Sequence, residues 1–215
     1  MTLSTHGAER VSLDTYYIQN HDLPVAYIDE SYNTDRSFSQ QYYILTAVIV
    51  QGSERDLLRD DLVEMVGGSH WHTTQALRTA DGREKTHRLL EYLAAEEGNE
   101  KCVLSVMSTI HPNDRDGEQA RKQAFYKLFE ELTPEIELFV LERRMNDAQA
   151  GIDANTKRDA IDAGICPPTT KMPQRSPAIE PLLWLPDLVC SAYRQRLTGR
   201  DCTYFDHVQE ISTLI

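Results

Sequence analysis

Apolar residues of this chain gather in short runs that end at turn-forming residues, which is the pattern of buried strands. The first run, residues 25–28, follows Pro24 and leads into the polar residues 29–33, which we interpret as a loop. The second run, residues 42–50, is apolar at odd and even positions alike, as in a strand buried on both faces. Together they predict a hairpin with a loop of about ten residues. Further strands are predicted over residues 102–110 and 136–141.

Apolar positions three and four residues apart predict helices between and after these strands. The first predicted helix follows Ser53 and ends at Gly67, because glycine is favoured just after a helix. An apolar, strand-like segment over residues 179–185 leads into the last helix, which begins near Pro186 and runs to about Leu197. The other helices are expected over residues 84–95, between Gly117 and Pro134, and over residues 154–163.

The order of these elements and the length of the chain indicate an α/β fold. A chain of 215 residues fits one domain of the usual size and is long enough to bury a core without a disulfide or a metal staple. We divide it into a polar N-terminal arm, residues 1–20, and a single domain, residues 21–215. Its hydrophobic content of 40% and charged content of 26% are those of an ordinary soluble protein.

The formal net charge of −12 argues against a protein that coats nucleic acid or an anionic membrane, because phosphate affinity comes mainly from Lys and Arg. Any contact with nucleic acid must therefore be local. The four cysteines form no Cys-x-x-Cys pair, which fits reduced thiols better than a disulfide framework or a zinc site. The sequence contains no secretory signal and no apolar run of about 18 residues, so we expect a cytoplasmic protein with no membrane partner.

Candidate chemistry lies at three predicted element ends, each of which carries a carboxylate. Asp29 follows the first strand, Glu142 ends the fourth, and Asp187 opens the last helix. If the sheet is partly parallel, ends of this kind converge where such folds bind their ligands. Carboxylate oxygens are the ligands that Mg²⁺ and Mn²⁺ prefer, and two such ions can activate water for phosphodiester cleavage.

Three sequence segments resemble one known family. Residues 27–31 read YIDES and precede the apolar strand YYILTAVIV, residues 139–144 read FVLERR, and residues 182–195 read LLWLPDLVCSAYRQ. In this order they are similar to the Tyr-Ile-Asp-Glu-Ser-Gly opening strand, the strand ending in an acid, and the Leu-Ala-Asp-Leu-Val closing helix of a widespread prokaryotic family of ribonuclease H-like proteins, domain of unknown function 3800. The resemblance spans most of the chain.

The resemblance implies a ribonuclease H-like fold, with a mixed central sheet of about five strands flanked by helices. It also implies a metal-dependent, nuclease-like site in which Asp29, Glu142 and Asp187 hold Mg²⁺ or Mn²⁺ and Glu30 assists. RNA or DNA would be the partner, bound at this local site. This chain departs from the family pattern at three positions: Tyr32 replaces Gly, Pro186 replaces Ala, and Glu142 stands where Asp is commoner.

Strand alternation sends Asp29 and Glu30 to opposite faces, so at most one of them faces a shared site unless a bulge intervenes, and we favour Asp29. His70 and His72 lie two apart and share a face if the chain is extended, which makes them candidate substrate contacts. Each of these residues also has a plain structural interpretation. Asp29 and Glu30 would cap a turn, Asp187 would interact with the helix dipole, and Glu142 would belong to a solvated charge cluster. The two histidines would be polar groups around the indole of Trp71.

Two further functions stay open at this point. The chain fits a catalytically silent ribonuclease H-like module that binds a protein partner, or a second copy of itself, through its acidic surface and the proline-rich residues 164–181. It also fits a hydrolase whose transition metal is held by His70 and His72. Metal binding and the separation of the carboxylates distinguish these possibilities from a nuclease.

Overall fold

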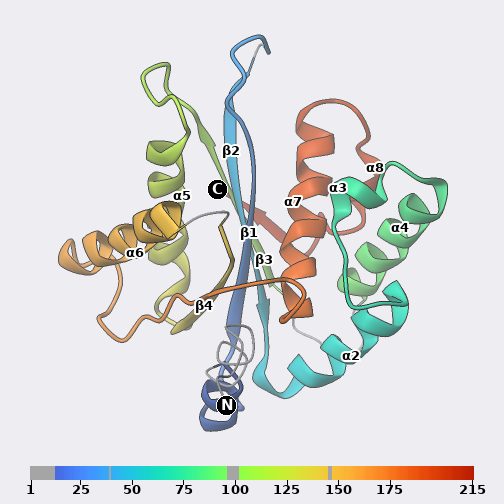
Figure 1. The fold of residues 1–215 in the computed structure, drawn as a ribbon, viewed down its shortest axis with the longest axis horizontal. Coiled ribbons are helices and arrows are strands. Elements are labelled where there is room, and N and C mark those ends of the chain that lie inside the picture. Colours follow the sequence, from blue (N-terminus) through green and yellow to red (C-terminus); the bar gives the residue numbers. More distant parts are fainter. Residues whose placement is uncertain (1–12, 39, 96–101, 145–146) are drawn as a thin grey trace.

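A computed structural model of the protein describes residues 13–38, 40–95, 102–144 and 147–215. Within them, six strands form one mixed sheet in the order β5-β4-β1-β2-β3-β6, and helices flank both of its faces (Figure 1). The predicted α/β class and the mixed sheet are thus confirmed, with six strands in place of about five. The strands are β1 (Val25–Asn33), β2 (Tyr42–Val50), β3 (Cys102–Thr109), β4 (Leu138–Glu142), β5 (Gln174–Arg175) and β6 (Ser212–Leu214).

Strand directions combine an antiparallel meander with parallel additions at its sides. β1 pairs antiparallel with β2, and β2 with β3. β4 joins β1 in parallel, β5 joins β4 in parallel, and β6 joins β3 in parallel. The carboxyl ends of β1 and β4 therefore lie at the same end of the sheet, which is the condition for their terminal acids to meet.

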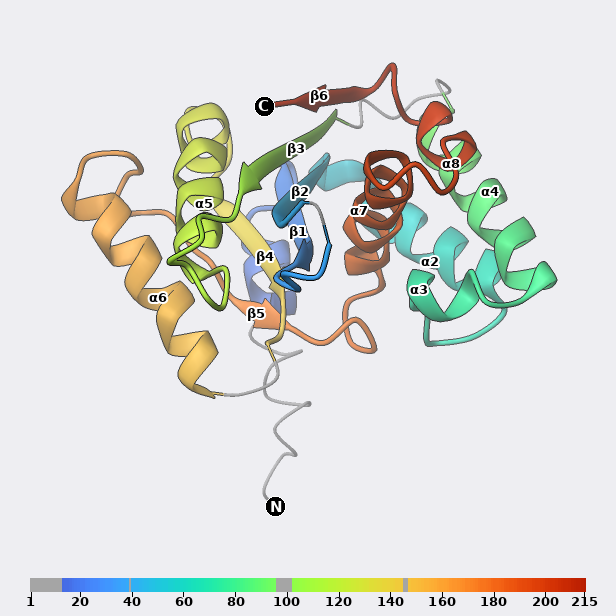
Figure 2. The same ribbon diagram turned by 90° about the horizontal axis from the view of Figure 1, so that it is seen from above.

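The helices divide into two groups, one for each face of the sheet. α5 packs on β2 and β3 and carries α6 on its outer side, whereas α7 packs on β1 and β2 and is flanked by α2, α3, α4 and α8 (Figure 2). The helical segments are η1 (Gly52–Glu54), α2 (Arg55–Val66), α3 (Thr73–Ala76), α4 (Ala80–Ala94), α5 (Glu118–Leu132), α6 (Asp147–Asp162), η2 (Pro181–Leu183), α7 (Trp184–Leu197) and α8 (Thr203–Asp206).

Alternation along β1 assigns its side chains to the two cores. Val25 and Tyr27 are buried in the cluster on the α7 side, while Ala26 and Ile28 are buried in the cluster on the α5 side. Because successive side chains of a strand point to opposite faces, the same alternation directs the polar residues that follow Ile28. The hydrophobic pattern of the strand thus determines the orientation of the acids at its end.

β1 is longer than the sequence suggested. Residues 29–33, which we expected to form a loop, continue the strand and pair with residues 42–46 of β2 in unbroken register. Their polar character is typical of a turn, but the antiparallel partner strand supplies the main-chain hydrogen bonds that keep the backbone of these residues extended. The hairpin connection is confined to residues 34–41.

The expected strand over residues 179–185 is wrong: residues 181–185 are helical, and a turn precedes them. Pro181 occupies the first turn of η2, and the side chain of Glu180 accepts a hydrogen bond from the Leu182 amide at 3.3 Å. Proline in the first turn and a side-chain cap before it both favour a helix start, and α7 continues from there. α6 is also longer than the predicted helix over residues 154–163.

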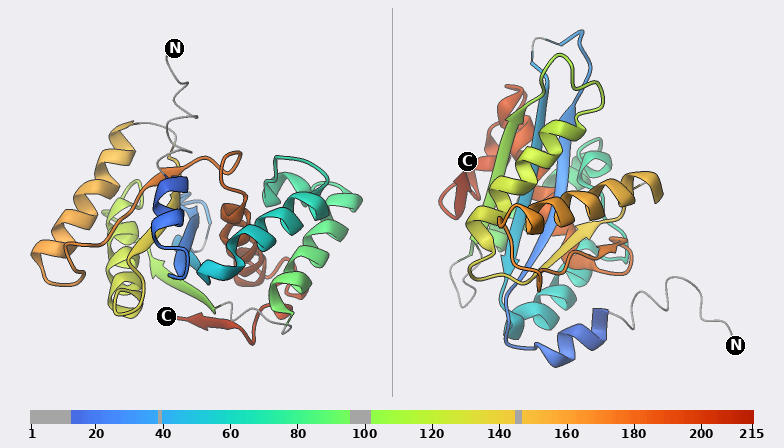
Figure 3. Two further views of the ribbon diagram at one scale, coloured as in Figure 1. Left: turned by 90° about the horizontal axis from the view of Figure 1, so that it is seen from below. Right: turned by 90° about the vertical axis from the view of Figure 1, so that its left-hand side faces the viewer.

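Part of the expected N-terminal arm packs against the sheet. Residues 13–19 form a helix at the end of the sheet where β1 begins, and Leu13 and Tyr17 are buried in the core on the α7 side (Figure 3). Residues 1–12 of that arm lie outside the described residues. In the part of the chain that the structure describes, no helix is both long and apolar enough to cross a membrane.

Candidate active site

The register of β1 and β4 brings two acids side by side. Ile28 is paired with Leu141 at the carboxyl end of the parallel ladder, so Asp29 and Glu142 come next on their strands. Both share the parity of Tyr27, which is buried in the core on the α7 side. Asp29 and Glu142 therefore lie on the face of the sheet that α7 covers.

The third acid reaches this place from α7. Asp187 lies in the first turn of that helix, and α7 packs across β1 and β2. Its Oδ2 accepts a hydrogen bond of 2.7 Å from the backbone amide of Thr73, the first residue of α3. The same oxygen lies 3.7 Å from Nδ1 of His72. Asp187 thus connects α3 to the site.

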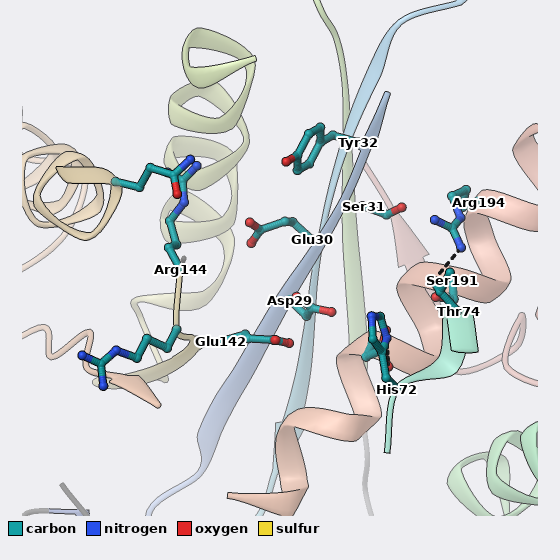
Figure 4. Close-up of a pocket in the computed structure, with 13 residues that line it drawn as sticks. Asp29, Glu30, Ser31, Tyr32, His72, Thr74, Glu142, Arg144, Ser191 and Arg194 are labelled. Atoms are coloured by element: carbon teal, nitrogen blue, oxygen red, sulfur yellow. Dashed lines mark hydrogen bonds and ion pairs between the residues drawn. The ribbon is translucent and has the colours of Figure 1, made fainter. Parts of the chain in front are cut away.

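These three acids line one pocket of about 380 Å³ (Figure 4). The structure therefore brings together the three carboxylates that the sequence placed at separate element ends. Four consecutive residues of β1 contribute to the same pocket, together with side chains from β4, α3, α6 and α7. The lining residues are Asp29, Glu30, Ser31, Tyr32, His72, Thr74, Glu142, Arg143, Arg144, Gln149, Asp187, Ser191 and Arg194.

Glu30 corrects the argument from strand alternation. We expected at most one of Asp29 and Glu30 to face a shared site without a bulge, yet both line the pocket and the register of β1 is continuous. The reason is that β4 ends at Glu142 while β1 continues, so the pocket lies on the open edge of β1 and is reached from both faces of the sheet. Glu30 points to the α5 side, where its Oε2 lies 2.7 Å from Nη1 of Arg121.

Burial and mutual repulsion dominate the electrostatics of the acids. Burial raises the pKa of Asp29 well above its usual range, and the charges of Glu142 and Asp187 raise it further. Burial and the charge of Asp187 likewise raise the pKa of Glu142 to about 7. The neighbouring Asp29 side chain partly offsets this rise in the pKa of Glu142. Burial and mutual repulsion thus favour the protonated forms of both carboxyl groups, as they do in other closely spaced pairs of acids.

The two candidate histidines lie in different positions beside the acids. The His72 side chain is about half exposed, and its interaction with the Asp187 carboxylate raises its pKa. His70 lines a second cavity of about 190 Å³, which adjoins the pocket at His72, Glu142 and Asp187. Trp71 turns into the core between the two histidines, and its indole N–H donates to the Thr73 hydroxyl at 2.9 Å.

Arginines at the margin of the pocket were not among the predicted site residues. Arg194 donates to the Thr74 hydroxyl at 3.0 Å, and Arg144 pairs with Glu118 at 2.5 Å, while Arg143 also lines the pocket. A sequence signal existed for Arg194, since it lies two helical turns after Asp187 and therefore on the same side of α7. Arg143 and Arg194 give an acidic chain cationic groups at this margin, while the charge of Arg144 is balanced by Glu118.

A second missed feature is a buried network behind Glu30. Arg121 is 1% exposed and binds both carboxylate oxygens of Asp153, at 2.8 and 3.0 Å. Its remaining guanidinium nitrogen bonds the Tyr43 hydroxyl and Glu30. The network joins α5, α6 and the two central strands. No local pattern in the sequence predicts it, because its members come from four separate elements.

The donor set suits a hard divalent cation. All three converging groups are carboxylates, and a cation among them would favour their ionised forms over their protonated forms. In the described residues, no three His, Cys, Asp or Glu side chains already have the arrangement of a metal site. A bound cation would therefore compete with the protonation that burial favours at Asp29 and Glu142.

Comparisons with protein-family models, with curated proteins and with solved structures found no match for this chain.

Proposed function

We propose that this protein is a nuclease that depends on Mg²⁺ or Mn²⁺, built on a ribonuclease H-like fold. One observation carries the proposal: acids from three remote parts of the chain line one pocket, and their charges and burial raise the pKa values of Asp29 and Glu142. Folding around uncompensated carboxylates costs stability, and such clusters gather at functional sites. A divalent cation would remove that cost.

The motifs that resemble the ribonuclease H-like family support the same conclusion. Each of the segments 27–31, 139–144 and 182–195 contributes an acid to the pocket, although more than a hundred residues separate the first from the second. A mixed sheet with helices on both faces is the architecture that this resemblance implies. Glu142 in place of the commoner Asp keeps a carboxylate at the same strand end.

The chain's own groups fit a phosphodiester substrate. Asp29, Glu142 and Asp187 would hold the metal, which when bound supplies the activation of a water molecule and the stabilisation of the leaving oxygen. Arg194 and Arg143 would bind the phosphates on either side and orient the strand. His72, whose pKa is raised by Asp187, would donate a hydrogen bond to the substrate at the edge of the pocket.

The test is cleavage of labelled RNA and DNA with Mg²⁺, Mn²⁺ or EDTA. We expect Asp29→Asn and Asp187→Asn each to lower the metal-dependent rate at least about 100-fold, more than the loss of an outer partner of a metal costs. Glu130→Gln, which removes one carboxylate charge from an exposed position of α5, should cleave like the parent protein. Full activity of a correctly folded Asp29→Asn variant would reject the assignment.

A catalytically silent module that binds a protein partner is the second candidate. The raised pKa values of Asp29 and Glu142 favour it, because protonation makes both buried acids neutral without a metal. Titration calorimetry with Mg²⁺ and Mn²⁺ separates the two functions. Heat of binding that disappears in Asp29→Asn supports the nuclease, and its absence in the parent protein supports the silent module.

A further inference from the structure

We propose that this site takes an unpaired nucleic-acid strand, with one base stacked on Tyr32 and a neighbouring base in the second cavity. The inference rests on the proposed nuclease function and adds the class of substrate. It follows from two features, the ring of Tyr32 and the second cavity, which lie on opposite sides of the acids. A base can reach either of them only when it is outside a duplex.

Tyr32 offers an aromatic ring that is fixed from behind. Its ring stacks on that of Tyr43, with centroids 5.3 Å apart and planes 6° from parallel. Tyr43 is itself buried, and its hydroxyl is bonded by Arg121. Tyr32 remains 50% exposed and lines the acid pocket. A large exposed aromatic side chain that is backed by a buried one provides a rigid surface for a flat ligand.

The second cavity lies at the other side of the acids. Figure 4 shows Tyr32 at one end of the site and His72 and Glu142 toward the other, and it is there that the cavity of about 190 Å³ begins. Its walls include Pro177, Ala178 and Leu183, with polar groups from His70 and Ser176. Apolar walls with a few hydrogen-bonding groups are typical of pockets for flat heterocycles.

Only an unpaired strand can use both features. In a duplex, each base is stacked on both faces and bonded along its edge, so it can enter a cavity or stack on a side chain only after it leaves the helix. Tyr32 lies three residues beyond Asp29, or about 10 Å along the strand at 3.3 Å per residue. The acids therefore lie between the two base positions, where the linking phosphate would pass.

The surrounding charges favour a nucleic acid over a peptide as the occupant. The pocket margin carries Arg143 and Arg194, which match phosphates along an extended strand, whereas Arg144 is paired with Glu118. The acids below them would take the metal that a phosphate shares. Flat aromatic surface, guanidinium groups and carboxylates together are the components of sites for single-stranded nucleic acid.

The experiment measures binding apart from cleavage. Fluorescein-labelled phosphorothioate oligonucleotides that resist hydrolysis are titrated with the full chain in Mg²⁺, as single strands of DNA and RNA and as the matching duplexes. We expect Tyr32→Ala and Ala178→Phe each to weaken single-strand binding at least about fivefold, the low end for loss of one stacked base. Tyr32→Trp should restore binding, because it keeps the aromatic surface.

Matched controls test whether the effect belongs to these positions. Phe38→Ala removes an exposed aromatic ring from the connection between β1 and β2, and Ala154→Phe adds one at an exposed position of α6; neither residue lines the pocket or the cavity. Both variants should bind like the parent protein. Circular dichroism and thermal melting of every variant establish that each is folded.

The outcomes separate the inference from the proposed function. Duplexes bound as tightly as single strands, or unchanged binding by folded Tyr32→Ala and Ala178→Phe, would overturn the inference even if the parent protein cleaves nucleic acid. Single-strand binding that depends on Tyr32, without cleavage in any metal, would support the inference and reject the nuclease. No binding of any oligonucleotide would overturn both and favour a protein partner.

Discussion

Glu142 shows how a single residue can be unfavourable for folding and still be useful. It lies in the inner wall of the pocket, and burial together with the charge of Asp187 raises its pKa to about 7. In an unfolded chain the same carboxyl group would ionise near its ordinary value of 4.5. Ionisation of Glu142 at neutral pH is therefore less favourable in the folded protein than in the unfolded chain. This difference in pKa lowers the free energy of unfolding.

This cost gives a prediction for Glu142→Gln in metal-free buffer. A folded-state pKa above the unfolded value means that the stabilising contribution is full below about pH 4.5 and is lost as the pH rises through about 7. We therefore expect the amide variant to be more stable than the parent protein at pH 8, by roughly 1 to 3 kcal/mol, and to differ less at pH 5. Urea denaturation at the two pH values measures this difference.

Glu130→Gln is the control for this prediction, since its carboxylate is exposed on α5. It should shift the free energy of unfolding by less than about 0.5 kcal/mol at either pH. A Glu142→Gln variant that is destabilised equally at pH 5 and pH 8 would contradict the electrostatic account. It would indicate that the carboxylate of Glu142 makes a contact that the folded state needs.

At the scale of elements, the contact between α3 and α4 holds the outer side of the site. α3 provides the Thr73 amide that binds Asp187 and the Thr74 hydroxyl that binds Arg194. Gly82, in the first turn of α4, lies directly against the end of α3: a Cβ added there would be 2.1 Å from the Ala76 carbonyl oxygen. Only a residue without a side chain lets these two helices approach so closely.

Gly82→Ala should therefore push α3 away from α7. We expect it to lower the free energy of unfolding by about 1 to 3 kcal/mol, the usual cost of overpacking, and to lower the affinity of the site for Mg²⁺. Gly68→Ala is a suitable control, because no atom lies within 4 Å of a Cβ added at Gly68. Urea denaturation and calorimetry provide the two measurements, and equal behaviour of both variants would contradict this role for the α3–α4 contact.

The sequence predicted those elements whose boundaries follow from local patterns of apolar residues and of residues that end helices or strands. β2 has the predicted bounds. α2 ends just before Gly67, as predicted, and Gly67 has the left-handed backbone conformation that glycine adopts readily. α7 carries Asp187 in its first turn, as predicted. The extension of β1 was missed because residues 29–33 are polar, and only pairing with β2 keeps them in a strand.

The same distinction applies to the site. Asp29, Glu142 and Asp187 were found because each follows or opens an element that the hydrophobic pattern outlines. The contact of Glu30 with Arg121 was not found, because it depends on how α5 packs on the sheet. The open edge of β1 was also invisible, since it arises from the different lengths of two strands that are distant in the chain.

At the scale of the whole molecule, the charges are distributed unevenly. The chain carries a net charge of −12, yet three arginines gather at the margin of one pocket. Binding of nucleic acid would thus rely on few phosphate contacts and on the metal. This differs from proteins that cover a long stretch of backbone with a basic surface.

We therefore expect the affinity for oligonucleotides to depend only weakly on the salt concentration. For a single strand each neutralised phosphate contributes about 0.7 to the slope of log K against log salt, so contacts of Arg143 and Arg194 predict a slope of about −1.4. Arg194→Gln should reduce its magnitude by about 0.7. Oligonucleotide titrations across a range of NaCl concentrations at constant Mg²⁺ give the slope. A much steeper slope would indicate a basic surface elsewhere on the protein.

The early end of β4 also affects how the protein behaves in solution. Beyond Ile28, no strand in the described part of the chain pairs with β1 on the β4 side, and an exposed strand border of this kind can recruit a strand from another molecule. Here any incoming strand would have to desolvate Glu30, Glu142 and Arg144. The carboxylates that make the pocket suitable for chemistry thus also protect the protein from self-association, and removing several of them at once would lower its solubility.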